Sequence, residues 1–422
     1  MSLTLVNKSS FLNDWLNQMN EKVTYVNDKA LVSSLKYIEE HGIPDLKSES
    51  YKYLNIESTI KRNFRSLTSA PASTVNSQVL EQYANKNFFT ILLHGKNILH
   101  DIKTDTVTIY NNPQKLPTNL SGYLNQSNLH QKDFFAALNT AYCSDILIIH
   151  ITKTPEKPIQ IVHSFEHQKN NFHQQRILVV TEQKVQATIY EKFICNNNHS
   201  VLSNLFTEVH ADKYSTINWI SCQNDLSNNL FCFNNFAVNA QHSTNINHHL
   251  VSLHGNLWKN NLHFFLQDEQ IKCSLNGLAY AKNKTIISNN TSIYHQKPNS
   301  ESHQQYKNIA DDKSTIVFNG FILVEQYAQK TNAYQNSKNI LLSENASVYA
   351  KPQLEIYADD VKCSHGSSTG YLNQDALFYL QSRGISQSEA QKLLINAFCN
   401  EVVSTLNNET IVSEIESLLT NY

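Results

Sequence analysis

A long central stretch of the sequence, from about residue 87 to residue 365, is built from short apolar runs rich in β-branched residues. Examples are residues 146–149 (Ile-Leu-Ile-Ile) and 177–180 (Ile-Leu-Val-Val), and Asn, Ser, Asp and Gly separate such runs. Runs of this length and composition, bounded by turn residues, are typical of strands. The sequence therefore predicts a mainly β molecule.

A faint repeat favours one β architecture over another. Ser-Leu-His-Gly at residues 252–255 recurs as Ser-Leu-Asn-Gly at residues 274–277, a step of 22 residues, and Gly320 lies 43 residues beyond Gly277. A period of about 20 to 25 residues in strand-rich sequence predicts a β-solenoid, in which each coil buries its inward side chains against its neighbours. A β-sandwich is the competing architecture, with hairpin turns roughly every 8 to 12 residues.

We expect Asn to occupy many of the turn positions in this chain, because only 9 glycines and 8 prolines occur in 422 residues. Asn is the usual residue other than glycine that tolerates left-handed backbone. We interpret the Asn clusters at residues 196–198 and 289–290 as turn corners, and not as a low-complexity tract.

Helix signals flank the central stretch. In the N-terminal part, apolar residues fall at helical spacing in two stripes, and Gly42 and Pro44 then provide stop signals. The stripes are Phe11, Leu12, Trp15, Leu16 and Met19, then Leu31, Val32, Leu35 and Ile38. After Gly370, residues 386–389 (Ser-Gln-Ser-Glu) match a capping box, and Gly384 is a candidate helix C-cap. The chain thus divides into an N-terminal helical region (1–86), a β core (87–370) and a C-terminal helical domain (371–422).

Composition excludes several classes of partner and compartment. The net charge of −2 and the pI of about 6.8 argue against nucleic acid or an anionic membrane surface as a partner. The seven cysteines are scattered and show no CxxC spacing, which indicates free thiols in a reducing cytoplasm. Residues 1–40 contain no continuous apolar run, so a signal peptide is not expected. No segment reaches the roughly 20 apolar residues of a membrane span.

The candidate metal ligands are Cys363 and His365, near the end of a strand-like run. In an extended strand, residues two apart point to the same face, so the thiol and the imidazole would project side by side. Sulfur beside imidazole nitrogen suits iron, copper or zinc. Two ligands do not fill a coordination sphere, so the remaining ligands would come from elsewhere in the chain or from a partner.

Other candidate sites are weaker. The histidines at 248, 249, 254 and 263 lie close in sequence, but adjacent residues on a strand point to opposite faces, which favours packing or surface roles. Asp359 and Asp360 resemble an acid and base pair for polysaccharide cleavage, and the same geometry argues against it. The sequence has no GxxxxGK[ST] motif, so the chain itself should not hydrolyse ATP. It also lacks a GxSxG elbow and a Rossmann fingerprint, the main nucleophile and dinucleotide-binding signatures.

Four segments of the chain resemble the SufD family, which supplies a scaffold subunit for iron-sulfur cluster assembly. The first is Gly42-Ile43-Pro44 with Glu49-Ser50-Tyr51-Lys52-Tyr53, and the second combines His295, Pro298, Ser302 and Lys307 with residues 317–320. The third runs from Ala328-Gln329-Lys330-Thr331-Asn332-Ala333 with Gln335 through residues 341–343 to 351–356. The fourth and most specific is Cys363-Ser364-His365-Gly366 through Ser382-Arg383-Gly384-Ile385.

The fourth segment also separates two related families. SufB proteins tend to have Glu-His-Glu-Ala where this chain has Cys-Ser-His-Gly at residues 363–366, which favours SufD. Residues 398–402 (Phe-Cys-Asn-Glu-Val) resemble a SufB ending instead, and we interpret Cys399 as a buried small hydrophobe on a helix stripe.

The resemblance implies a right-handed parallel β-helix core with N-terminal and C-terminal α-helical regions. It implies that the C-terminal end of the β-helix pairs with SufB, and that the C-terminal helices bind SufC, an ABC-type ATPase. His365 would be the main ligand of iron or of a transient iron-sulfur cluster at the SufB interface, with Cys363 as its neighbour. Flavin binding is associated with complexes of this family, although no residue here identifies such a site.

Two classes of function therefore remain. The first is a non-enzymatic scaffold subunit of a cluster-assembly complex, with a SufB-like subunit or a homodimer as variants of it. The second is a β-solenoid enzyme acting on a polysaccharide, which a secretion signal and grouped carboxylates on one face would favour. The sequence shows neither feature.

Overall fold

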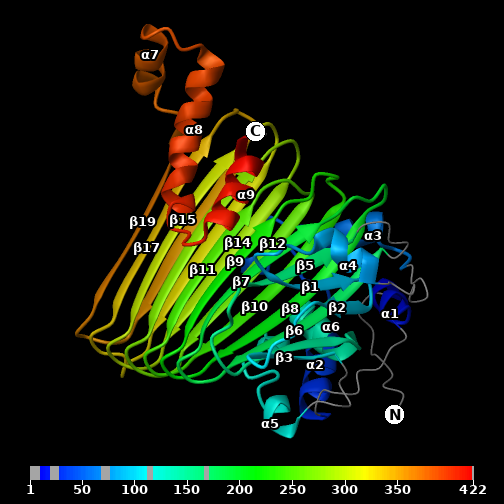
Figure 1. The fold of residues 1–422 in the computed structure, drawn as a ribbon. Helices are drawn as coiled ribbons and strands as arrows, with labels where there is room; N and C mark the ends of the chain where they lie inside the picture. Colours follow the sequence, from blue (N-terminus) through cyan, green and yellow to red (C-terminus); the bar gives the residue numbers. More distant parts are fainter. Residues whose placement is uncertain (1–9, 20–27, 68–76, 112–116, 166–170, 421–422) are drawn as a thin grey trace.

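The computed structural model describes residues 10–19, 28–67, 77–111, 117–165 and 171–420. These residues form a mainly β molecule, a parallel β-solenoid of about 8 turns with helices in both the N-terminal and the C-terminal parts of the chain. Figure 1 shows the strands stacked side by side along the solenoid. The predicted fold class is confirmed.

Two sheets make up the solenoid in the described part of the chain. Sheet A has the order β19 (Lys362–Tyr371), β17 (Asn332–Leu341), β15 (Glu301–Ala310), β13 (Lys272–Ala281), β11 (Asn245–Ser252), β9 (Thr216–Gln223), β7 (Gln186–Ile194), β5 (Ile159–Ser164), β1 (Phe89–His94) and β2 (Asn97–His100). Sheet B has the order β18 (Ser347–Ile356), β16 (Thr315–Val324), β14 (Ile286–His295), β12 (Leu257–Leu266), β10 (Leu230–Ala240), β8 (Val201–Ala211), β6 (Phe172–Thr181), β4 (Ile146–Ile151) and β3 (Val107–Tyr110). The pairings are parallel except β1 with β2 and β3 with β4.

One coil of the solenoid is longer than the predicted 22 residues. Paired residues on neighbouring strands are 26 positions apart at Phe231 and Leu257, and 32 apart at Thr315 and Ser347. Gly277 pairs with Leu250 and with Tyr306, so it does not repeat Gly255. The period of 20 to 25 residues is therefore wrong, although the solenoid that it suggested is correct.

Two of the three glycines that suggested this period, Gly255 and Gly277, serve different local needs. Gly255 has φ +153° in a turn, and a Cβ there would lie 2.3 Å from the indole nitrogen of Trp258. Gly277 lies in β13 against the ring of Tyr306, and a Cβ added at this position would lie 2.1 Å from Cε1 of that ring. Glycine therefore marks close approach of side chains in this chain, and not a fixed place in each coil.

Alternate residues of each strand point into the space between the two sheets. The main core cluster, which includes Ile246, Trp258 and Ile316, fills this interior. Polar side chains also lie inside, where Asn289 accepts a hydrogen bond from Asn260 (Nδ2 to Oδ1, 2.8 Å). Asn289 and Asn290 are thus residues of β14 and not a turn corner, whereas Asn228, Asn283 and Asn299 do have positive φ.

Helices of the N-terminal part, together with three short helices between β3 and β4, mostly cover the outer face of sheet B. They are α1 (Ser10–Leu16), α2 (Asp28–His41), η1 (Glu49–Tyr51), α3 (Ile56–Asn63), α4 (Ser77–Tyr83), α5 (Thr118–Ser121), η3 (Leu129–Gln131) and α6 (Phe134–Tyr142). Trp15, Ile60 and Phe135 join one cluster with Phe233 of β10, and the Phe135 and Phe233 rings stack at 3.6 Å. α4 is the exception, because it contacts β1 of sheet A.

The predicted N-terminal stripes agree with α1 and α2, and Gly42 follows α2 with φ +66°. Two details differ. Val32 of the second stripe is 60% exposed, and Met19 lies beyond the end of α1. The sequence analysis also missed α6, whose Asp133 N-cap accepts hydrogen bonds from the backbone N–H groups of Phe135 and Ala136.

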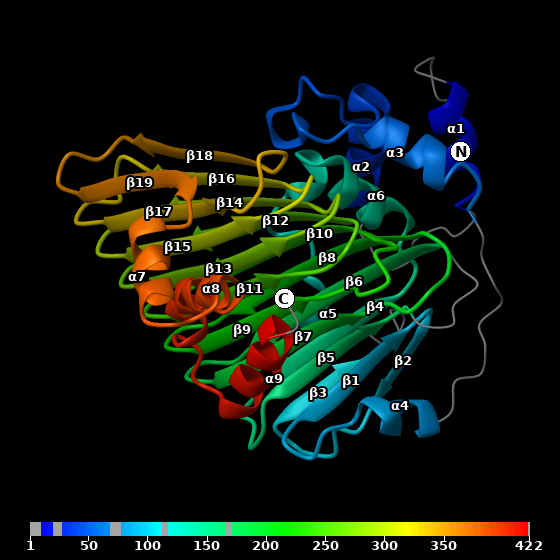
Figure 2. The same ribbon diagram turned by 90° about the horizontal axis from the view of Figure 1, so that it is seen from above.

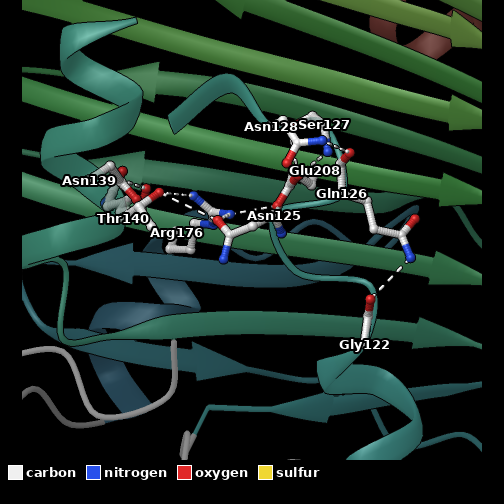
Figure 3. A network of polar contacts seen from close by, with 10 residues as sticks. Gly122, Asn125, Gln126, Ser127, Asn128, Asn139, Thr140, Arg176 and Glu208 are labelled. Atoms are coloured by element: carbon white, nitrogen blue, oxygen red, sulfur yellow. Dashed lines mark hydrogen bonds and ion pairs between the residues drawn. The ribbon is translucent and has the colours of Figure 1, made fainter. Parts of the chain in front are cut away.

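A buried ion pair ties the loop before α6 to sheet B (Figure 3). The guanidinium of Arg176 donates to Glu208 Oε2 at 2.5 Å, and both side chains are at most 2% exposed. Glu208 also accepts from the backbone N–H groups of Asn125 and Ser127 and from the Ser127 hydroxyl. Because Glu208 thus has partners for both oxygens, this network is a structural anchor for the loop.

The C-terminal helices lie on the other side of the solenoid. They are α7 (Gln374–Ser382), α8 (Gln387–Val403) and α9 (Glu409–Thr420). The predicted capping box of Ser386 and Glu389 is present at the start of α8. α8 and α9 pack on the outer face of sheet A, where Lys307 of β15 pairs with Glu401 of α8 at 2.5 Å. Figure 2 shows α2, α3 and α6 on one side of the strands and α8 and α9 on the other, where α4 also lies. No helix of the described residues is long and apolar enough to cross a membrane.

Candidate functional site

The last coil of the solenoid, formed by β18 and β19, ends without a covering coil in the described residues. β19 pairs only with β17, and β18 only with β16, so one edge of each strand has no strand beside it. Nine of the ten residues of β19 are exposed and the tenth is half-buried. We call this end, β18 with β19, the open end of the solenoid (Figure 2).

Cys363 and His365 both lie on β19, at the open end. Cys363 pairs with Ala333 of β17 and packs against the interior core cluster, so its side chain points inward. His365 is two residues further along the same strand and therefore shares this inward face, and it is exposed. The two predicted ligands are thus side chains of the solenoid interior that solvent reaches because no further coil follows.

The Cys363 thiol is held mainly in its protonated form. Partial burial raises the pKa of Cys363 above its ordinary value, although a hydrogen bond with the backbone of Ala333 lowers the pKa in part. A thiol must lose its proton to bind a metal. Binding of a cation beside Cys363 would supply the charge that favours the thiolate.

Gln335 is the residue paired with His365 on the neighbouring strand, and its side chain also points inward. We call such a line of inward residues at paired positions on successive strands an inward column. Gln335 of β17 is paired in register with His365 and is 3% exposed. Neither its amide nitrogen nor its amide oxygen has a hydrogen-bond partner. In the sequence Gln335 belongs only to a family-like motif, because its alignment with His365 depends on the length of a coil.

The chain supplies too few ligands for a complete metal site. No group of three or more His, Cys, Asp or Glu side chains in the described residues is placed to hold a metal ion. A four-coordinate site at His365 and Cys363 would take its other ligands from another molecule.

Exposed aromatic and aliphatic side chains surround the open end. Tyr349 and Ile356 of β18 are 41% and 40% exposed, Tyr357 follows β18 and is 63% exposed, and Tyr371 of β19 is 60% exposed. The Tyr349 ring also stacks on Tyr53 at 3.9 Å, so the N-terminal region reaches this end. Grouped exposed apolar side chains beside unpaired strand edges are typical of a protein interface.

The other predicted candidates do not form sites. His248 points inward between the rings of Phe236 and Phe264, and burial lowers its pKa to about 3. His249 points outward, donating to or accepting from Thr405 at 2.9 Å, and burial lowers its pKa to about 4. The two adjacent histidines thus occupy opposite faces, as predicted.

His263 and the two neighbouring aspartates likewise form no site. His263 stacks near Phe265 and Tyr294 on the outside of sheet B, and burial together with the nearby lysines lowers its pKa to about 3. Asp359 and Asp360 are exposed in the turn between β18 and β19, and not on a strand as the sequence analysis assumed.

The cysteines other than Cys363 are buried, and all seven are free thiols. Cys399 of α8 is 1% exposed within the cluster between α8 and sheet A, which confirms its interpretation as a buried small hydrophobe. Burial raises the pKa of Cys399 to about 12. Such thiols are poor nucleophiles and poor ligands.

Two family models match the chain. The SufBD core domain of the SUF system for FeS cluster assembly matches residues 164–398, and the SufBD protein N-terminal region matches residues 11–161. The first match covers β6 to β19 and most of the C-terminal helical region, and so includes the open end.

Curated relatives agree with these matches. The chain is 28% identical to the iron-sulfur cluster assembly protein SufD of Escherichia coli, over 97% of this chain and 96% of that protein. It is 31% identical to the iron-sulfur cluster assembly SufBD family protein slr0076 of Synechocystis, over 68% of this chain and 65% of that protein. It is also 36% identical to SufD of Bacillus subtilis, over 31% of this chain and 30% of that protein.

Proposed function

Because the chain belongs to the SufBD family of iron-sulfur cluster assembly proteins, we propose that it is a non-catalytic scaffold subunit of a SufB, SufC and SufD type complex. In this proposal His365 is the main ligand that the chain contributes to the nascent cluster, and Cys363 is its neighbour. The observation that carries the proposal is the open end, where an inward thiol and an inward imidazole meet solvent.

A SufB-like subunit would bind at the open end. The free edges of β18 and β19 offer unpaired backbone groups, and the exposed tyrosines around them offer apolar area. Another strand-rich subunit stacked there would cover both, and it would bring the missing ligands to His365 and Cys363. The cluster would then form as cargo between two chains, shielded from water by both.

A SufC-like ABC ATPase would bind the C-terminal helices. In Figure 1, α7 and the first part of α8 extend away from the solenoid. Phe378 and Tyr379 of α7 are 72% and 58% exposed, and Leu393 of α8 is 49% exposed. Exposed apolar side chains on projecting helices suit a docking surface. The sequence has no phosphate-binding loop motif, so ATP hydrolysis would take place in that partner.

The proposed division of labour follows the three regions of the chain. Residues 1–86 would support sheet B, residues 87–370 would present the cluster site, and residues 371–422 would bind the ATPase. The seven free thiols suit a reducing compartment, for which we propose the cytoplasm. A flavin in the assembled complex stays unassigned to any residue of this chain.

The test is the cluster content of the assembled complex after His365→Ala. The chain would be co-expressed with its SufB-like and SufC-like proteins and purified without oxygen, and iron and sulfide per complex would be measured. Loss of a direct ligand should lower cluster content by at least the roughly tenfold that loss of an outer hydrogen-bond partner costs. Cys363→Ala should lower it less.

His303→Ala is the matched control. His303 is an exposed histidine of β15 on the outer face of sheet A, where its ring stacks on Tyr334 at 5.2 Å. We expect this variant to keep full cluster content. The proposal is wrong if His365→Ala and His303→Ala complexes carry equal clusters. If the chain is recovered only as a homodimer joined through the open end, the partner at that end is a second copy of this chain and not a SufB-like subunit.

A further inference from the structure

The buried amide of Gln335 is the one inward polar side chain in direct register with His365. It lies on the neighbouring strand, β17, at the paired position. Neighbouring strands are about 4.8 Å apart, so the two side chains occupy adjacent layers of the interior. Gln335 is 3% exposed, and both its amide atoms lack a partner.

The preceding residue of the inward column shows how Gln335 differs. Gln304 of β15 occupies the same column one coil earlier. Its amide nitrogen donates to the hydroxyl of Thr291 on the opposite sheet, and its amide oxygen alone lacks a partner. Gln335 instead faces Gly320, which has no side chain to offer.

Gly320 makes room for the Gln335 amide. A Cβ at position 320 would lie 1.3 Å from Nε2 of Gln335, so only glycine leaves the amide in its present place. The amide therefore occupies a space that is kept free for it, one layer below His365. Nothing else in the described residues uses its hydrogen-bonding capacity.

Metal-bound imidazoles need such a group. A histidine that binds a metal through one ring nitrogen almost always donates its other N–H to an oxygen acceptor, which fixes the ring and raises its basicity. An amide oxygen is a suitable acceptor. We propose that Gln335 is a positioning residue, whose Oε1 accepts the ring N–H of His365 when the other nitrogen binds iron or the nascent cluster. This inference rests on the proposed role of His365.

The test compares three variants in the assembled complex by anaerobic titration with Fe²⁺. Gln335→Leu removes the acceptor and keeps similar volume, and we expect Fe²⁺ to bind at least about tenfold more weakly. Gln335→Glu keeps an oxygen acceptor, so we expect affinity at or near that of the unmodified complex. Gln304→Leu makes the same change one coil earlier, and we expect it to leave the affinity unchanged.

Each outcome has a separate meaning once His365→Ala is titrated beside these variants. If His365→Ala does not weaken Fe²⁺ binding, the proposed function fails. If His365→Ala weakens binding but Gln335→Leu does not, only the role of Gln335 is overturned. Equal losses for Gln335→Leu and Gln304→Leu, or no rescue by Gln335→Glu, would show that packing of the interior matters and not the acceptor.

Discussion

Two inward histidines, one near each end of the solenoid, have opposite surroundings. His163 of β5 is fully buried, and both ring nitrogens are bonded, one to Gln175 at 2.6 Å and one to Glu191 at 2.9 Å. His365 of β19 is exposed, and its neighbour Gln335 has no partner. The chain can satisfy an interior imidazole by itself, and at the last coil it does not. The difference indicates a site that another molecule completes.

The outermost strands at the first and the last coil of the solenoid also differ. At the first coil the edge of β1 is covered by the antiparallel strand β2, and the edge of β4 by the antiparallel strand β3. α4 adds a further contact with β1. At the last coil β18 and β19 lack such covers in the residues that the structure describes. β2 and β3 are only four residues long, and such short edge strands discourage further pairing, so the longer edges of β18 and β19 are better suited to association.

The largest expected effect is unfolding in acid, driven by histidines that are buried away from the open end. Burial lowers the pKa to about 3 or 4 for His130, His248, His249 and His295, all less than a tenth exposed. Below pH 6.5 the unfolded chain takes up protons that the folded chain does not, so each group lowers stability by on the order of 1.4 kcal/mol per pH unit. Together they remove roughly 8 kcal/mol at pH 5, comparable with a typical total stability. We expect circular dichroism to show unfolding between about pH 4 and 5.5.

Replacement of one of these histidines tests whether buried imidazoles cause the unfolding in acid. His248→Phe keeps an aromatic ring beside Phe236 and Phe264 and removes one proton acceptor of the unfolded chain. It should recover on the order of 2 kcal/mol at pH 5 and move the unfolding midpoint to lower pH. An unchanged midpoint for His248→Phe would show that this buried imidazole does not contribute to unfolding in acid.

The second effect concerns the buried hydrogen bonds of Glu191, near the first coils of the solenoid. Glu191→Leu leaves the imidazole of His163 and the indole N–H of Trp219 without their carboxylate partner. Leaving a buried polar group unsatisfied costs about 1–3 kcal/mol for each group. We expect a loss of this size in the free energy of unfolding, measured by urea titration at pH 7.5.

Gln335→Leu is the counterpart at the open end. Its amide atoms have no partner, so removing them leaves no other group unpaired. Replacing an unsatisfied buried amide by an apolar side chain is neutral or stabilising. We therefore expect unchanged or higher stability, opposite in sign to Glu191→Leu. Similar losses from the two substitutions would mean that the two ends differ less than their hydrogen bonds indicate.

The sequence predicted those parts of the molecule that depend on local pattern. Alternation gave the strands and put Cys363 and His365 on one face, and stop signals gave the end of α2. α6 was missed because Phe134, Phe135, Leu138 and their neighbours are buried all round, which leaves no amphipathic stripe to detect. Gln335 was missed as a site residue because its place beside His365 depends on register between strands a whole coil apart, and local spacing carries no such information.

The smallest expected effect separates glycines of the interior from glycines of the open end. Gly277→Ala would place a Cβ 2.1 Å from the fully buried ring of Tyr306, and overpacking of this kind costs about 1–3 kcal/mol. Gly320→Ala meets mainly the end of the flexible Gln335 side chain, with Cζ of Phe318 at 3.0 Å, so a smaller loss is expected. Gly366→Ala on β19 has no atom nearer than 3.8 Å and should change stability by less than about 0.5 kcal/mol. Urea titration of the three variants would rank them in this order if packing tightness falls toward the last coil. A loss at Gly366 equal to that at Gly277 would show that the open end is as tightly packed as the interior, and it would remove the structural reason for placing a shared site there.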